Sequence, residues 1–180
     1  MKLNVLEHAS PQDAALEESR ATTPVLDYIG ALRRMIGNTK IIIPGVRALL
    51  LNDRGELLLE EQRLFGSWAL PHGCVDLGES ALQALTREVH EETGLDVLRA
   101  RAFGLYTDPK YSVTYPNGDQ VQTFTIAFVV DEWRGTLRPD GDEVRALGFF
   151  ALDALPSPIY PIHAETIDDF RAADGTFVLK

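Results

Sequence analysis

The segment from Ser80 to Gly94 constrains the fold most, because it specifies a helix with two marked ends and two chemically different faces. Ser80 suits the N-cap position, and Gln83 three residues later completes a capping box. Gly94 is the residue type that most often follows a last helical turn. At about 100° per residue, the helix is predicted to bury one stripe and to gather its acids beside it. The stripe is Leu82, Leu85 and Val89, and the acidic sector is Glu88, Glu91 and Glu92 with the small residues Ala81 and Ala84.

The acidic sector of this helix is unfavourable unless something neutralises it. Like charges three or four positions apart on a helix cost about 0.2–0.5 kcal/mol per pair, and more beside an apolar stripe. Two explanations are open: the carboxylates are fully solvated, or a hard divalent cation binds them. Arg87 is the only lysine or arginine from Ser80 to Gly94, and this scarcity of basic partners favours the cation.

The remaining pattern predicts a mixed α/β protein. Strands are expected over 40–51, 57–59, 68–70, 102–114, 121–131 and 147–151, with a closing helix over 160–172. The turn residues 52–55 predict a hairpin between the first two strands. Asn117-Gly118 predicts a second hairpin between the long runs.

The chain before residue 40 is expected to be an N-terminal extension rather than part of the sheet. Residues 1–23 are polar and weakly patterned. Thr23 as N-cap and Pro24 at the first helical position predict a helix that ends at Gly37. Its apolar stripe packs either against the rest of the chain or against a second copy in a homodimer.

Composition limits the classes of function. A length of 180 residues favours one domain. The formal net charge of -10 disfavours long nucleic acids as partners. The single cysteine, Cys74, excludes an internal disulfide framework, and neither a signal peptide nor a membrane-spanning run is recognised. A cytoplasmic protein that acts on small anionic molecules is therefore expected.

The spacing around the helix resembles the Nudix box, which is Gly, five residues, Glu, seven residues, then Arg-Glu-aliphatic-x-Glu-Glu-x-Gly-aliphatic. Gly73, Glu79 and the run from Arg87 to Leu95 fill every fixed position. If each of the seven single-residue positions matched by chance at about 7%, one window would match on the order of once in 10^8.

This resemblance implies an α/β fold of the Nudix type, an α/β/α sandwich around a mixed β-sheet. It assigns residues 40–180 to the Nudix hydrolase domain and residues 1–39 to an N-terminal arm and helix. It implies a divalent-metal-dependent hydrolase of the phosphoanhydride bond in a nucleoside diphosphate linked to another moiety, such as ADP-ribose or a nucleotide sugar. Removal of pyrophosphate from nucleoside triphosphates or an RNA 5′ end is one alternative. A catalytically inactive nucleotide-sensing module is the other.

The resemblance also assigns roles to individual residues. Glu88, Glu91 and Glu92, with the backbone carbonyl of His72, match the positions that hold Mg²⁺ or Mn²⁺. Glu79 and Arg87 match a pair that braces the loop before the helix. The general base in such proteins is a box glutamate, here Glu91, or a carboxylate on a later loop. In this chain the later loop is the run from Asp140 to Glu143, of which Glu143 is chosen; the alternative is that this run is an acidic surface turn.

Several further residues are candidates for substrate contacts. Arg47, Arg63 and Lys110 lie where they could reach phosphates, and Tyr106, Tyr111 and Tyr115 could stack on a base; the alternative for each is core or edge packing. His72 stands where members of the family often have a first glycine of Gly-Gly. Cys74 is expected to be a small filler rather than a nucleophile.

Overall fold

The computed structural model describes residues 28–180, and the chain divides into two compact units, Met1–Met35 and Ile36–Lys180. Helix α2 covers Tyr28–Ile36 and is followed by Gly37, whose φ of 60° is left-handed. The predicted end of this helix is thus confirmed. Its predicted start at Thr23 and the arm over residues 1–23 lie outside the described residues.

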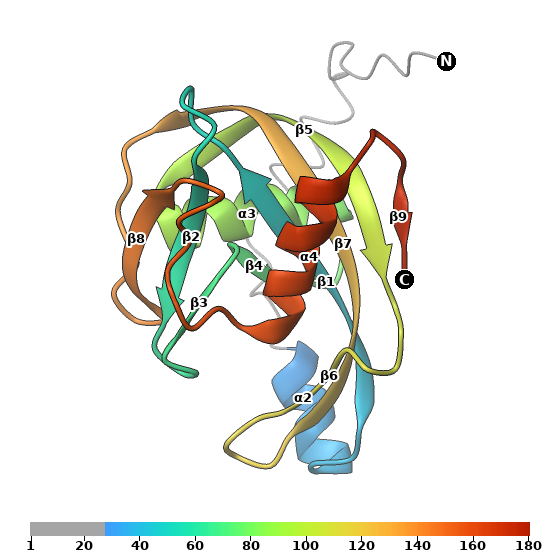
Figure 1. Cartoon of the computed structure of the whole chain (residues 1–180). Helices are drawn as coiled ribbons and strands as arrows, with labels where there is room; N and C mark the ends of the chain where they lie inside the picture. Colours follow the sequence, from blue (N-terminus) through green and yellow to red (C-terminus); the bar gives the residue numbers. More distant parts are fainter. Residues whose placement is uncertain (1–27) are drawn as a thin grey trace, which may run out of the picture. The chain divides into compact units, whose positions relative to one another are not determined.

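The larger sheet is mixed, and the strand β1 lies inside it, between β4 and β7 (Figure 1). β1 (Ile41–Leu50) pairs in parallel with β7 (Gln120–Gly135) and antiparallel with β4 (His72–Cys74). Beyond β7, the order continues through β5 (Leu95–Tyr106) to β9 (Val178–Leu179), and β6 (Ser112–Thr114) also pairs with β7. Both neighbours of β1 are therefore distant from it in the sequence.

A second, antiparallel sheet has the order β3-β2-β8, formed by Ser67–Ala69, Leu57–Gln62 and Val144–Phe150. The predicted hairpin between β1 and β2 is wrong. The turn exists, since Gly55 N donates to Asn52 O, but only the single bridge between Leu51 and Leu57 joins the two strands. Because β4 and β7 already occupy both edges of β1, β2 continues into the other sheet.

Helices α3 (Ala81–Thr93) and α4 (Pro161–Ala172) cover opposite faces of the larger sheet (Figure 1). Side chains of a strand alternate between the two faces. Accordingly, Val46 and Ala48 of β1 lie in one buried cluster with Val89 of α3, whereas Leu49 lies in another with Ile167 of α4. This layered arrangement confirms the predicted α/β fold.

Helix α3 has the predicted ends, and Leu85 and Val89 of the predicted stripe are buried, but the limits of the buried face differ. The Ser80 side chain accepts from Gln83 N, the capping box is complete, and Gly94 is left-handed with φ of 74°. The expectation that Leu82 is buried is wrong, because it is 49% exposed, whereas Ala84 and Glu92 are buried. The helix is rotated so that its acidic sector partly faces the interior.

The other elements differ from expectation mainly in their limits. The run predicted as one strand over 102–114 forms parts of two strands, because the residues between β5 and β6 are not in a strand. β5 also begins earlier than predicted, at Leu95. The Asn117-Gly118 hairpin is confirmed between β6 and β7, where Thr114 pairs with Gln120. β8 begins three residues before the expected strand, and α4 matches the closing helix. Within residues 28–180, no helix is long and apolar enough to cross a membrane.

Candidate active site

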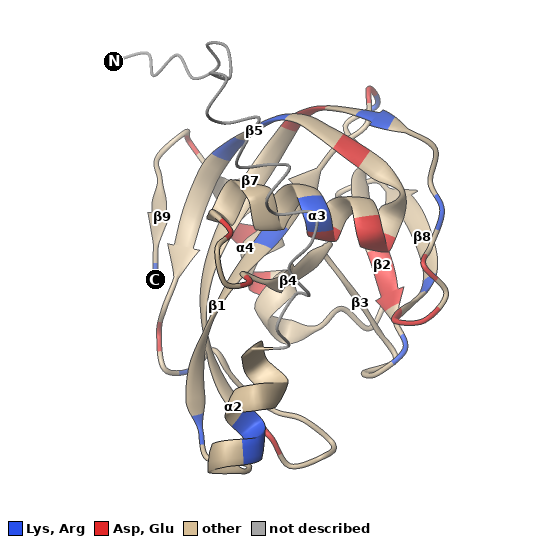
Figure 2. Cartoon of the chain, turned by 180° about the vertical axis from the view of Figure 1, so that it is seen from behind, with Lys and Arg blue, Asp and Glu red and all other residues tan. Residues whose placement is uncertain are grey.

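A cavity of about 990 Å³ opens where β4, α3 and the ends of several strands meet. Figure 2 shows acidic residues on α3, on β2 and in neighbouring loops. The cavity has an acidic part and an aromatic part. Its acidic lining is Glu88, Glu91, Glu92, Asp140, Asp142 and Glu143, and its aromatic lining includes Phe65, Tyr115 and Tyr160.

Arg87 ties the loop before α3 to the helix. Its Nε donates to Glu79 Oε1 over 2.7 Å, and its Nη2 donates to Glu79 Oε2 over 2.9 Å and to the carbonyl of Cys74 over 3.0 Å. The hydrogen bonds from Arg87 hold the pKa of Glu79 below its ordinary value. This two-pronged contact fixes the geometry of the loop that follows β4.

The three box glutamates differ in their surroundings. Glu88 is mostly buried and lies 2.9 Å from Arg87 Nη1, whereas the Glu91 side chain is 56% exposed and lies 3.1 Å from the same atom. Glu92 is only 4% exposed and accepts a hydrogen bond from His72 N over 2.9 Å. Burial raises the pKa of both Glu88 and Glu92, so anionic forms of these two carboxyls are unfavourable without a positive partner.

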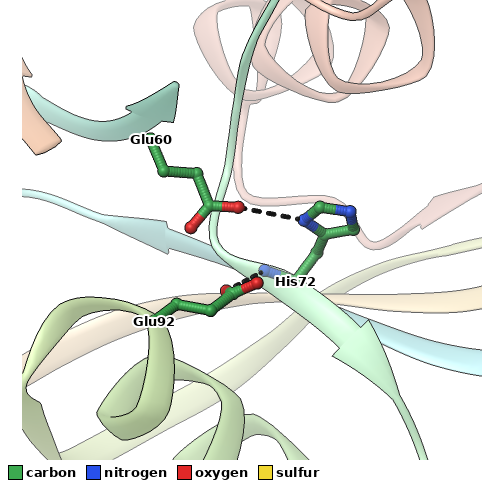
Figure 3. A group of neighbouring side chains, drawn as sticks. All are labelled: Glu60, His72 and Glu92. Atoms are coloured by element: carbon green, nitrogen blue, oxygen red, sulfur yellow. Dashed lines mark hydrogen bonds and ion pairs between the residues drawn. The ribbon is translucent and has the colours of Figure 1, made fainter. Parts of the chain in front are cut away.

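A buried group that the sequence did not reveal lies beside Glu92 (Figure 3). Ligand atoms of Glu60, His72 and Glu92 lie within 4.8 Å of one another. Glu60 is 0% exposed, its Oε1 lies 3.3 Å from His72 Nδ1, and no N–H or hydroxyl group of the described residues donates to its Oε2. Burial raises the pKa of Glu60 above its ordinary value. The signal was present as a charged residue following the apolar run Leu57 to Leu59, but it has no counterpart in the box.

These donor types suit a divalent cation, and among the described residues the ligand atoms that lie within 4.8 Å of one another are those of Glu60, His72 and Glu92, not those of the three box glutamates. Carboxylate oxygens from Glu88, Glu91 and Glu92 are the ligands that Mg²⁺, Mn²⁺ and Ca²⁺ prefer. The unpartnered buried oxygen of Glu60 is the kind of atom that a cation would satisfy. The backbone N–H of His72, not its carbonyl, makes the contact with Glu92.

Arg47 is a buried cation on the wall of the cavity. It is 2% exposed, and its Nη1 donates to Ile162 O over 3.0 Å and to Thr166 Oγ1 over 2.5 Å. Burial lowers its pKa to about 10, which still leaves it charged near neutral pH. In the part of the chain that the structure describes, the Nε of Arg47 has no hydrogen-bond partner. Arg47 therefore presents an incompletely satisfied positive charge at the cavity.

The other candidates for substrate contacts divide into two groups. Arg63 and Tyr115 line the cavity. Tyr106 and Tyr111 are 0% and 1% exposed, so the expectation that they could stack on a base is wrong; their rings pack against each other in the core. Lys110 is outside the cavity lining and pairs with Glu165 over 3.0 Å.

The aromatic part of the cavity contains two residues that the sequence did not single out. The centroid of the Phe65 ring lies 4.9 Å from the centroid of the Tyr160 ring and 5.9 Å from that of the Tyr115 ring. Ser67, which also lines the cavity, is 6% exposed, and its Oγ has no hydrogen-bond partner among residues 28–180. These residues come from three separate segments, which is why no local motif indicated them.

The acidic loop before β8 reaches the cavity rim. Asp140 Oδ1 accepts from the N–H groups of Asp142, Glu143 and Val144, which holds the loop in a tight turn. Glu143 is exposed and lines the cavity. Its carboxylate is thus free to face a molecule bound there.

Cys74 also lines the cavity and is exposed, so it does not fill the interior as expected. Partial desolvation and the nearby carboxylates of Glu88 and Asp76 raise the pKa of its thiol to about 11. The thiol is therefore protonated near neutral pH and a poor nucleophile.

Comparisons with known proteins agree on one family. The profile described as NUDIX domain matches residues 42–170. An ADP-ribose pyrophosphatase of Methanocaldococcus jannaschii is 34% identical over 69% of this chain and 70% of its own length. A candidate 8-oxo-dGTP diphosphatase of Bacillus subtilis is 31% identical over 71% of this chain and 78% of its own length. The crystal structure of a MutT NUDIX hydrolase from Burkholderia pseudomallei superposes with a TM-score of 0.61, at 28% identity, over 71% of this chain and 97% of that one.

Proposed function

This chain belongs to the Nudix family and is a pyrophosphohydrolase, and from that premise we propose that it hydrolyses ADP-ribose or a nucleotide sugar with the help of Mg²⁺ or Mn²⁺. The observation that carries the proposal is the composition of the cavity. One part is lined by carboxylates suited to a cation and a diphosphate, and another by aromatic rings suited to a nucleoside.

In this proposal Glu88, Glu91 and Glu92 hold the cation, with the carbonyl of His72 as a further oxygen. A bound divalent cation supplies neutralisation of the phosphate charge and lowers the pKa of a water molecule. Arg87 keeps the carboxylates in place through its contacts with Glu88 and Glu91, while it anchors the loop through Glu79.

The residues around the acidic part of the cavity contact the phosphates, the attacking water and the nucleobase. Arg47 and Arg63 contact phosphate oxygens, and the buried Arg47 is the stronger partner because little water screens its charge. A carboxylate of Glu91 or Glu143 accepts the proton of the attacking water; both are exposed to the cavity. Tyr115 stacks on the nucleobase, together with Phe65.

A substrate panel tests this function. The protein is incubated with Mg²⁺ or Mn²⁺ and with ADP-ribose, nucleotide sugars, dinucleoside polyphosphates and nucleoside triphosphates. We expect turnover of ADP-ribose or a nucleotide sugar, lost in Glu92→Gln while circular dichroism stays unchanged. Glu132→Gln is the matched control, because Glu132 is exposed, pairs with Arg99 and lies outside the cavity lining.

Other outcomes would favour the alternatives. Turnover restricted to triphosphates would replace the proposed substrate class. Tight binding of a nucleotide without any hydrolysis would identify a sensor. An excess of chelator, or Ca²⁺ in place of Mg²⁺, is expected to abolish turnover, and undiminished activity in excess chelator would exclude the proposed role of the cation.

A further inference from the structure

We propose that Glu60, His72 and Glu92 form a second cation position, distinct from the one made by the box carboxylates alone and suited to an ion such as Mn²⁺ that accepts both carboxylate and imidazole ligands. This inference rests on the proposed function, because Glu92 serves both positions. Glu60 comes from β2, and so from outside the box and outside the larger sheet.

The burial of two neighbouring carboxylates is the first argument. Glu60 and Glu92 are 0% and 4% exposed. Within residues 28–180, the basic group that forms an ion pair with Glu60 is the ring of His72, and no lysine or arginine does so. Two buried acids side by side are costly unless a cation or a proton compensates them.

The unpartnered oxygen of Glu60 is the second argument. Oε1 accepts from Gln62 Nε2 and faces His72, whereas no N–H or hydroxyl group of residues 28–180 donates to the buried Oε2. Buried carboxylate oxygens are almost always satisfied. In Figure 3 the Glu60 carboxylate faces the space between the His72 ring and Glu92. An ion placed there would satisfy this atom.

The distances fit one ion. Twice a metal–ligand distance of about 2.0–2.6 Å allows the ligands of one cation to lie up to about 4–5 Å apart. The three ligand atoms lie within 4.8 Å of one another.

The donor types narrow the choice of ion. Imidazole suits transition metals, so a set of two carboxylates and an imidazole favours Mn²⁺, Zn²⁺ or Fe²⁺ over Mg²⁺ and Ca²⁺. Mn²⁺ is the one of these three that the proposed function already uses. His72 Nδ1 also lies 3.0 Å from the carbonyl of Leu70. Ligation through this nitrogen requires the proton to sit on Nε2 and the contact with Leu70 to be given up. His72 is therefore the weakest of the three donors.

Direct measurement of Mn²⁺ binding tests the inference. Metal-free protein is titrated with Mn²⁺, and free Mn²⁺ is followed by electron paramagnetic resonance. In Glu60→Gln we expect one Mn²⁺ fewer per chain, or a site weakened about tenfold or more. His72→Ala should have a smaller effect. Glu61→Gln is the control, because Glu61 is adjacent on β2, points to the opposite face and pairs with Arg145.

Thermal unfolding provides a readout that separates a cation ligand from a merely structural residue. Without metal, Glu60→Gln should unfold at the same or a higher temperature than the wild type, since it removes a buried acid next to Glu92. With Mn²⁺, the rise in unfolding temperature should be smaller in this variant than in the wild type. A structural role would instead lower the temperature of the metal-free protein and leave the Mn²⁺-dependent rise unchanged, which contradicts the inference.

One comparison distinguishes this inference from the proposed function. If Glu88→Gln weakens Mn²⁺ binding but Glu60→Gln binds as the wild type does, the box site stands and the second position does not exist. If neither Glu88→Gln nor Glu92→Gln changes Mn²⁺ binding, the metal site of the proposed function fails as well.

Discussion

The Glu88 carboxylate lies against Gly73, where a Cβ at position 73 would overlap the carboxyl group of Glu88. Gly73→Ala is therefore expected to push this carboxylate away from the cavity and to lower kcat by about a hundredfold, since small misplacements of catalytic groups have effects of that size. Steady-state kinetics measure the loss. In a Glu88→Ala background the same substitution should cost little more; equal losses in both backgrounds would contradict the explanation.

Arg87 and Glu79 are expected to stabilise the protein as a unit. Hydrogen bonds to charged groups contribute about 1.5–3 kcal/mol, and both side chains are largely shielded from water. Arg87→Lys keeps the charge but loses the double contact. Urea unfolding of Arg87→Lys, Glu79→Gln and the double variant should give a coupling free energy of about 1–2 kcal/mol. If the losses in free energy of unfolding of the two single variants simply add up in the double variant, the pair is not a structural unit.

The same pair predicts how stability depends on acid. Hydrogen bonds from Arg87 lower the pKa of folded Glu79 below 4.5, its ordinary value. Its contribution to stability is therefore fully present above about pH 4.5 and is lost as the pH falls through the folded pKa. The difference in free energy of unfolding between wild type and Glu79→Gln should shrink steadily below pH 4.5. A constant difference from pH 3 to 7 would argue against this effect.

Phe65 is expected to contribute to binding of the nucleoside rather than to chemistry. Stacking of an aromatic ring on a base is worth about 1–3 kcal/mol, so Phe65→Ala should raise KM about tenfold and change kcat little. Phe177→Ala is the control, because Phe177 is 51% exposed and lines a different cavity. A fall in kcat at unchanged KM would place Phe65 in another role.

The local features of this fold were predictable because neighbouring residues encode them. The capping box at Ser80 and the left-handed Gly94 depend on short-range hydrogen bonds, and the box spacing identified the acidic helix. The prediction of a hairpin at Asn52 was wrong because β1 pairs with β7, which is distant in the sequence, and turn residues carry no information about such long-range pairing.

The acidic part of the site was predictable from one motif, whereas its surroundings were not. Glu60 approaches Glu92 only because β2 leaves β1 and joins the second sheet. The rings of Phe65 and Tyr160 lie close together although the two residues are far apart in the sequence. The burial of Tyr106 depends on α4, with which its hydroxyl bonds through Asp169, and that contact has no local signal.

The alternation of side chains between the two faces of β1 also determines where residues can be inserted or deleted. Val46 faces the layer of α3, and its neighbour Arg47 faces the layer of α4. One inserted residue before this pair would turn the guanidinium toward the apolar side and a valine toward the carbonyl of Ile162. Natural variants of this protein should therefore gain or lose residues in the exposed turn between β1 and β2, which lies outside the cavity lining, and keep the number of residues in β1 constant.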